Sequence, residues 1–168
     1  MELDLILNGA VESGMKWVCF TGGEPLLQRE AEKLVHLLTD QGINVLIETG
    51  GSIPVKPFTK FDHAFIDMDV KTPSSGEENT LYTDNLFYLR AQDYVKFVIS
   101  DQKDYEYSKA FLTKVPDNIQ IIFHRNRKVP LQYPVHPLIS DPLPLTLREY
   151  NEIISLEPLP ISSYAAGP

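Results

Sequence analysis

Short apolar runs alternate with segments of helical spacing along most of this chain of 168 residues. The apolar runs begin roughly 20 to 30 residues apart, which suits a repeated unit of one strand and one helix. The five runs expected to be strands are 17–20, 44–48, 64–70, 94–99 and 119–123. Strands that alternate with helices pair in parallel, with the helices crossing over the sheet. The alternation therefore predicts an α/β fold built on a parallel sheet.

Helical spacing occurs both before the first apolar run and between the runs. The segment 2–13 carries apolar residues at helical spacing. Pro25 suits the first turn of a second helix, which we expect to end at Gly42. Further helical patterns cover 79–91 and 105–114. A parallel barrel normally begins on a strand, whereas this chain begins on a helix. We therefore expect an incomplete (βα)6-type parallel partial barrel without its first strand.

The sequence changes character after Lys128. Eight of the 13 prolines lie in the remaining segment, which favours extended backbone, laid over the domain or partly disordered. Thr146 and Glu149 have the spacing of a capping box, so one short helix is expected there. We therefore divide the chain into a core of residues 1–128 and a proline-rich extension of residues 129–168.

Charge and composition exclude several classes of function. The formal net charge of −8 argues against a nucleic-acid-binding surface, because phosphate binding requires a basic patch. No apolar run is long enough to span a bilayer, and the acidic residues after Met1 are unlike a secretory signal. A single cysteine excludes an internal disulfide and a multi-cysteine metal site within this chain. We therefore expect a cytoplasmic protein that binds neither nucleic acid nor a membrane.

The segments that follow the expected strands carry the candidate ligand-binding residues. In parallel α/β folds, ligands bind at the carboxyl ends of the strands. The run Thr21-Gly22-Gly23-Glu24-Pro25 lies at the first such end, and its glycines allow a ligand to approach the backbone. Glu24 offers an acceptor for an ammonium group, and the helix start that follows suits a carboxylate. These features fit an amino acid, whereas the alternative is an ordinary turn with an exposed glutamate.

Four segments, in order, resemble motifs of the radical S-adenosylmethionine enzymes. Residues 21–28, TGGEPLLQ, resemble the Gly-Gly-Glu-Pro motif of that superfamily. Residues 48–51, ETGG, resemble its Glu-Thr-Asn-Gly motif, with Gly50 in place of asparagine. Residues 69–76, DVKTPSSG, and residues 96–99, KFVI, resemble the 7-carboxy-7-deazaguanine synthases in particular. Four ordered motifs at compatible spacings are stronger evidence than any one of them.

The resemblance covers about residues 2–123 and implies a specific reaction with specific cofactors. Enzymes of the superfamily use a 4Fe-4S cluster to cleave S-adenosylmethionine reductively to a 5′-deoxyadenosyl radical. The synthases use that radical to convert 6-carboxytetrahydropterin to 7-carboxy-7-deazaguanine, a precursor of queuosine and archaeosine. They use magnesium and are commonly homodimers. The resemblance thus implies a lyase that binds S-adenosylmethionine and a pterin-like small molecule.

By their positions in these motifs, two groups of residues are implied to bind ligands. Those implied for the cofactor are Thr21, Gly22, Gly23, Glu24, Glu48, Thr49 and Lys71, and those implied for the substrate are Thr72, Ser74 and Lys96. The resemblance assigns no catalytic residue and no metal ligand within this chain.

Two lysines have alternative interpretations. Lys71 either pairs with a carboxylate of the cofactor or substrate, or forms a salt bridge with Asp67 or Asp69, and both readings stay open. Lys96 lies in an apolar strand, where it either points into the barrel or faces a helix with its ammonium group extended to solvent. We favour the second arrangement for Lys96.

The cysteine and histidines give no metal-binding pattern. Cys19 lies in an apolar run and is expected to be a small buried hydrophobe. The four histidines are scattered without the spacing of metal ligands. His124 lies beside Arg125 and Arg127, so this group is either an anion site or, as we favour, a solvated basic edge.

The sequence departs from the family in the part that would hold the cluster. The superfamily uses three cysteines, usually in a Cys-x-x-x-Cys-x-x-Cys loop after the first strand, and Cys19 alone does not supply three thiolates. We expect that strand and the cluster loop to lie upstream of Met1, and the magnesium site that the family builds beside that loop to be missing from this chain. The chain is therefore expected to be inactive alone. It is then a truncated reading frame, a degenerate relative, or one half of a pair whose other polypeptide supplies the cluster.

Two rival functions accompany this reading. The first is a glycyl-radical-enzyme activase, which belongs to the same superfamily and also carries Gly-Gly-Glu-Pro. The run of residues 71–76, KTPSSG, favours the synthase. The second is a non-catalytic module that keeps the fold and binds a ligand or partner.

Overall fold

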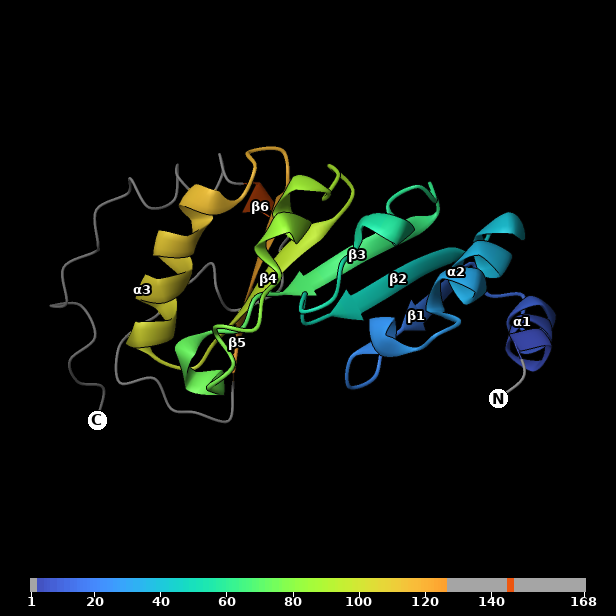
Figure 1. Ribbon diagram of the computed structural model, residues 1–168, viewed down its shortest axis with the longest axis horizontal. Helices are drawn as coiled ribbons and strands as arrows, with labels where there is room; N and C mark the ends of the chain where they lie inside the picture. Colours follow the sequence, from blue (N-terminus) through green and yellow to red (C-terminus); the bar gives the residue numbers. More distant parts are fainter. Residues whose placement is uncertain (1–2, 127–144, 147–168) are drawn as a thin grey trace, which may run out of the picture.

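The computed structural model describes residues 3–126 and 145–146, and its centre is a six-stranded sheet (Figure 1). The first five strands are parallel, and each lies beside the next one in the sequence, while the sixth pairs antiparallel with the fifth. The strands are β1 (Trp17–Phe20), β2 (Asn44–Thr49), β3 (Ala64–Asp69), β4 (Tyr94–Ile99), β5 (Gln120–Arg125) and β6 (Leu145–Thr146). The expected α/β fold built on a parallel sheet is confirmed.

β6 adds an antiparallel strand that the sequence did not predict. It lies in the segment expected to be a proline-rich extension, so at least this part of that segment joins the sheet of the core. The helix expected from Thr146 onward lies outside the described residues.

The described part of the chain contains three α-helices and several short 3-10 helices. The α-helices are α1 (Leu3–Glu12), α2 (Ala31–Asp40) and α3 (Gln102–Phe111). The 3-10 helices are η1 (Pro25–Leu27), η2 (Lys56–Phe58), η3 (Pro73–Ser75), η4 (Thr83–Phe87) and η5 (Leu112–Lys114). Within these described ranges, no helix combines the length and the apolar character needed to cross a membrane.

The helix expected to start at Pro25 is a correction. Pro25 opens only the 3-10 turn η1, in which the Gln28 backbone N–H donates to the Pro25 carbonyl. The Glu24 side chain accepts from the Leu26 backbone N–H and fixes this tight turn. The α-helix begins at Ala31 instead. A three-residue turn has no developed dipole, so the expected helix N-terminus for a carboxylate is absent here.

The helix expected over 79–91 is a second correction, because only η4 forms there. The side chain of Asn85, which is fully buried, donates to the backbone carbonyls of Gly51 and Ile53 and accepts from the Val55 N–H. These bonds tie the segment to the loop after β2. Contacts between distant segments therefore override the helical spacing of the sequence.

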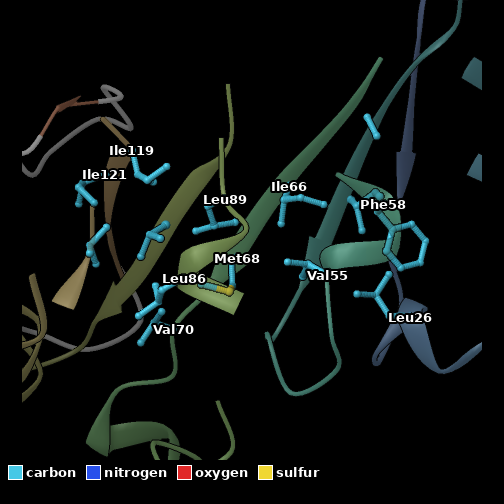
Figure 2. Close-up of a cluster of buried hydrophobic side chains, with 14 of the residues drawn as sticks. Leu26, Val55, Phe58, Ile66, Met68, Val70, Leu86, Leu89, Ile119 and Ile121 are labelled. Atoms are coloured by element: carbon cyan, nitrogen blue, oxygen red, sulfur yellow. The ribbon is translucent and has the colours of Figure 1, made fainter. Parts of the chain in front are cut away.

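One face of the sheet is apolar and covered. Its buried strand residues include Val45, Ile47, Ile66, Met68, Val95, Phe97 and Ile121. α2 contacts β2 and α3 contacts β4. Figure 2 shows Ile66 and Met68 in the same buried cluster as Leu86, from η4, and Leu89, which follows it. This face holds the sheet against its connecting segments.

The opposite face, which we call the polar face, carries Cys19, Glu48, Asp67, Asp69 and Lys96. The register pairs Glu48 with Asp67 and Asp69 with Lys96, so these side chains share one face. Cys19 reaches the same face, because it pairs with the residue two positions before Glu48. Charged groups thus gather on one side of a sheet whose other side is the core.

β1 is more exposed than its apolar sequence predicts. Trp17 is 51% exposed and Cys19 is also exposed, so the expectation that Cys19 is a buried small hydrophobe is wrong. The reason is that both side chains project from the polar face of a strand that has one neighbour, β2, among the described strands. Trp17 contacts the ring of Phe65, with the two centroids 4.8 Å apart.

A buried ion pair organises the opposite end of the sheet, where β3 and β4 begin. Asp93 is fully buried and accepts from the Ile66 N–H and from the backbone and guanidinium of Arg90. Arg90 also donates to the backbone carbonyls of Thr59, Phe61 and Ala64. The pair therefore joins the loop before β3 to the loop before β4.

We expect Asp93→Ala to lower the free energy of unfolding by about 3 kcal/mol, because it leaves Arg90 and the Ile66 N–H without their acceptor. Urea unfolding, followed by the fluorescence of Trp17, measures the loss. Asp62→Ala is the control, since Asp62 is exposed, and it should change the stability by less than about 0.5 kcal/mol. Equal effects of the two variants would contradict the role assigned to Asp93.

Candidate ligand site at the carboxyl edge of the sheet

The Glu24 carboxylate connects the loops that follow β1 and β2. The Thr49 hydroxyl lies 2.9 Å from both carboxylate oxygens, and the Gly50 N–H donates to Oε2 at 3.0 Å. The Leu26 N–H donates to Oε1 at 3.2 Å. The chain's own donors thus occupy this carboxylate. Glu24 is neither an exposed turn residue nor a free acceptor for an ammonium group, but the link between two loops.

The second loop is held in place by Thr49 and Gly51. Thr49 is buried, and its hydroxyl also accepts from the Gly51 N–H at 3.0 Å. Gly51 has a φ of 72°, and an added Cβ would lie 2.6 Å from the Leu81 side chain. Only glycine fits this position, because the conformation and the space both exclude a side chain.

The first loop is open where the sequence predicts ligand approach. Gly22 has a φ of 152°, and an added Cβ at Gly22 or Gly23 would meet no heavy atom within 4 Å. A Cβ at Gly50 would lie 3.6 Å from Glu24 Oε2 and 3.7 Å from Lys71 Cε. The glycine-rich loop, through Glu24, and Lys71 therefore lie at the same edge of the sheet.

Two lysine–aspartate pairs line the polar face next to this edge. Lys71 Nζ lies 2.7 Å from Asp69 Oδ2, and Lys96 Nζ lies 2.7 Å from Asp67 Oδ2. The salt bridge is thus the arrangement that Lys71 adopts. The expectation that Lys96 faces a helix is wrong, since its neighbours in β4 face the core and Lys96 alternates to the polar face.

Burial and the ion pair shift the pKa values of Asp67 and Lys96 in opposite directions. Burial raises the pKa of the Asp67 carboxyl, and the Lys96 ammonium only partly offsets this. Burial lowers the pKa of Lys96, but the bond to Asp67 and the nearby carboxylates outweigh it, so the pKa of Lys96 is raised. Lys96 therefore keeps its proton, and the site is rich in negative charge.

Three more predicted residues have identifiable partners. The Thr21 hydroxyl donates to Glu48 Oε2 at 3.1 Å, which joins β1 to β2 above the polar face. The Thr72 hydroxyl donates to the Val98 carbonyl at 2.9 Å. The Ser74 N–H donates to the carboxylate of Asp104 at 2.8 Å. The Thr72 hydroxyl and the Ser74 N–H therefore hold the loop after β3 in place through these two hydrogen bonds.

Asp104 is a residue that the sequence reasoning missed. It is fully buried, and its two carboxylate oxygens accept from the Ser74 and Ser100 N–H groups. It therefore fastens the loop after β3 to the loop after β4, as Glu24 does for β1 and β2. Its position three residues after the helix N-cap Asp101 gave no sign of this role, because such a residue is ordinarily exposed.

Asp67 and Asp69, which the sequence offers as partners of Lys71, both belong to the polar face. The alternation of Asp67 and Asp69 in β3 is the signal that could have identified them, since alternate residues of a strand share a face.

The described residues contain no group of three or more potential metal ligands placed to hold an ion. Cys19 is exposed, yet partial desolvation by its surroundings, followed by the charges of Glu48 and Asp67, raises the pKa of its thiol and so favours the neutral form. The basic group expected at Arg125 and Arg127 lies outside the described side chains.

We expect Lys96→Met to lower the free energy of unfolding by about 3 kcal/mol at about pH 7.5, because Asp67 loses its cation. The pKa of Asp67 then rises further, so the loss should shrink toward about pH 5 as the carboxyl protonates in the folded state. Urea unfolding at both pH values measures this.

The control for Lys96→Met is Lys60→Met. Lys60 pairs with Glu32, and the two side chains are 58% and 49% exposed, so the expected loss is below about 1 kcal/mol at either pH. A loss in Lys96→Met that is as small as the control, or that grows toward acid, would contradict the buried pair.

Comparison with known proteins identifies similar sequences. The chain is 45% identical over 123 residues to the 7-carboxy-7-deazaguanine synthase of Thermoplasma acidophilum, covering 73% of this chain and 59% of the relative. It is 40% identical over 111 residues to that of Clostridium acetobutylicum, covering 65% and 50%. It is 46% identical over 92 residues to that of Koribacter versatilis, covering 54% and 40%. No family model matches the sequence.

Solved structures show the same fold. The crystal structure of Streptococcus suis SuiB matches with a TM-score of 0.58 and 16% identity, covering 90% of this chain and 38% of SuiB. SuiB bound to S-adenosylmethionine matches with a TM-score of 0.57 and 16% identity, covering 89% and 36%. At this identity the likeness concerns the fold alone.

The chain spans about half the length of the curated relatives it matches. Over that part, the resemblance to the 7-carboxy-7-deazaguanine synthases, and through them to the radical S-adenosylmethionine superfamily, is confirmed.

Proposed function

We propose that this chain forms the S-adenosylmethionine-binding edge of a protein related to the 7-carboxy-7-deazaguanine synthases. The observation that carries the proposal is the open Gly22–Gly23 loop, which Glu24 holds beside Gly50 and Lys71. The related synthases and the S-adenosylmethionine-bound SuiB structure, which has the same fold, support it.

The residues at this edge divide into those that touch the ligand and those that shape the edge. Backbone carbonyl groups at Gly22 and Gly23 would accept from the methionyl ammonium group, and Lys71 would pair with the methionyl carboxylate. Glu24 and Thr49 would hold the loops in position, because their polar groups already bond to each other. The hydrogen bond between Thr21 and Glu48 would bound the binding edge on the side of the polar face.

The iron–sulfur cluster does not fit this chain by itself. The sequence contains one cysteine, and the described residues contain no group of three Cys, His, Asp or Glu side chains placed to hold a metal ion. We therefore propose no radical step for this polypeptide alone. A pterin-like substrate, magnesium, a homodimer and a cytoplasmic location belong to this proposal through the related synthases.

Isothermal titration calorimetry with S-adenosylmethionine tests the binding edge. An added methyl group at Gly23 meets no protein atom, so Gly23→Ala should fold normally, yet it should weaken binding by about tenfold because it occupies the space of the ligand. Gly9→Ala is the control, since its Cβ also meets nothing and it lies in α1. Binding that is absent in the unmodified chain, or unchanged in Gly23→Ala, would contradict the proposal.

Anaerobic reconstitution with iron and sulfide, followed by an assay for 5′-deoxyadenosine, tests the expected inactivity. We expect no product above the protein-free background, since three thiolates are needed to hold the cluster. Product that depends on this chain alone would show that the cluster is held in another way.

A further inference from the structure

The loop after β2 is held from two sides. On the side of the candidate site, the Gly50 N–H donates to Glu24 Oε2 at 3.0 Å. On the other side, the Gly51 carbonyl accepts from the side-chain amide of Asn85 and from the Tyr82 N–H, each at 2.9 Å. Asn85 lies in η4, and Tyr82 is the N-cap of that turn. The glycine of the candidate site and the glycine that η4 holds are therefore consecutive in the chain.

Asn85 uses its whole amide group on this loop. It is fully buried, its Nδ2 donates to the carbonyls of Gly51 and Ile53 at 2.9 Å, and its Oδ1 accepts from the Val55 N–H at 2.9 Å. A side-chain amide has two N–H donors and one oxygen acceptor, and all three are bonded here. Any shift of the loop would leave a buried polar group unpaired, which is costly. Asn85 therefore fixes the position of the loop.

Packing gives the loop no room to move toward η4. A Cβ added to Gly51 would lie 2.6 Å from the Leu81 side chain and 2.9 Å from that of Met68. Leu86, which follows Asn85, belongs to the same buried cluster as Met68 (Figure 2). The loop after β2 thus rests directly on the segment that carries Asn85.

We propose that Asn85 is a positioning residue of the binding edge. It holds Gly51, and through the next bonds it sets the place of Gly50 and Glu24, which anchors the open Gly22–Gly23 loop. The inference rests on the proposed function, which it deepens by adding a residue from outside the four motif segments. Asn85 itself would not touch the ligand, because its amide is buried and fully bonded. Its effect would travel through a continuous chain of hydrogen bonds.

The test is Asn85→Asp in the full chain, measured by calorimetry with S-adenosylmethionine and by amide hydrogen exchange. The variant keeps the shape of the side chain and its acceptor, but it sets a carboxylate against two backbone carbonyls. We expect binding to weaken about tenfold, because the edge is no longer held in one position. We also expect the Gly50 and Gly51 amides to exchange faster relative to the other amides of β2.

Control variants separate positioning from a general loss of stability. Asp93→Ala removes a buried pair at the opposite end of the sheet, so it should change neither the affinity nor the relative exchange of the glycine amides. Leu81→Ala carries the test if Asn85→Asp does not fold, and we expect it to weaken binding about threefold by opening space beside Gly51. Phe87→Ala is its control, since Phe87 lies in η4 and is 82% exposed.

Unchanged binding in Asn85→Asp, unchanged binding in Leu81→Ala, or equal weakening by Asp93→Ala would overturn the positioning role. If Gly23→Ala weakens binding and Asn85→Asp does not, Asn85 has no such role and the proposed binding edge stands. If the unmodified chain does not bind S-adenosylmethionine, the proposed function is wrong. The relative exchange of the two glycine amides then decides on Asn85 alone: faster exchange in Asn85→Asp supports its hold on the loop, and unchanged exchange refutes it.

Discussion

The bond network of the Glu24 carboxylate is the constraint on which the candidate site depends. Its hydrogen bonds join the loop after β1 to the end of β2 and the loop that follows it. The carboxylate accepts from Thr49 and Gly50 across the gap and from Leu26 within its own turn. The open glycines keep their exposed backbone because the residue that follows them is anchored. The anchored Glu24 thus holds the loop in place while the backbone of Gly22 and Gly23 stays exposed.

The two faces of the sheet differ in their roles. One face forms the core, and the other lies beside the candidate ligand site. The apolar face and the buried Arg90–Asp93 pair hold the strands together, and the pair lies at the end of the sheet away from the glycine loop. The polar face carries charged side chains, among them the paired Asp67 and Lys96, and lies next to the carboxyl edge. Asp104 repeats for β3 and β4 the connection that Glu24 makes for β1 and β2. These two carboxylates therefore hold the loops of the carboxyl edge in place.

Sequence reasoning predicted the parallel α/β core and the edge at which the motifs gather, because strand alternation and glycine-rich turns are local signals. It failed where contacts between residues far apart in the sequence determine the local structure. Asn85 replaces a helix with a 3-10 turn by bonding to the loop after β2. Cys19 looked buried because its neighbours are apolar, yet its side chain lies on the polar face. The partners of Lys96 and Asp104 depend on register, which one strand alone does not define.

We infer that S-adenosylmethionine binds at the edge that Glu24 anchors. The most direct measurement is a map of backbone amide shifts during titration with S-adenosylmethionine. The account predicts the largest shifts at Gly22, Gly23 and Gly50, with the Arg90–Asp93 end unchanged. Shifts concentrated around Arg90 and Asp93, or none at the three glycines at saturation, would contradict it.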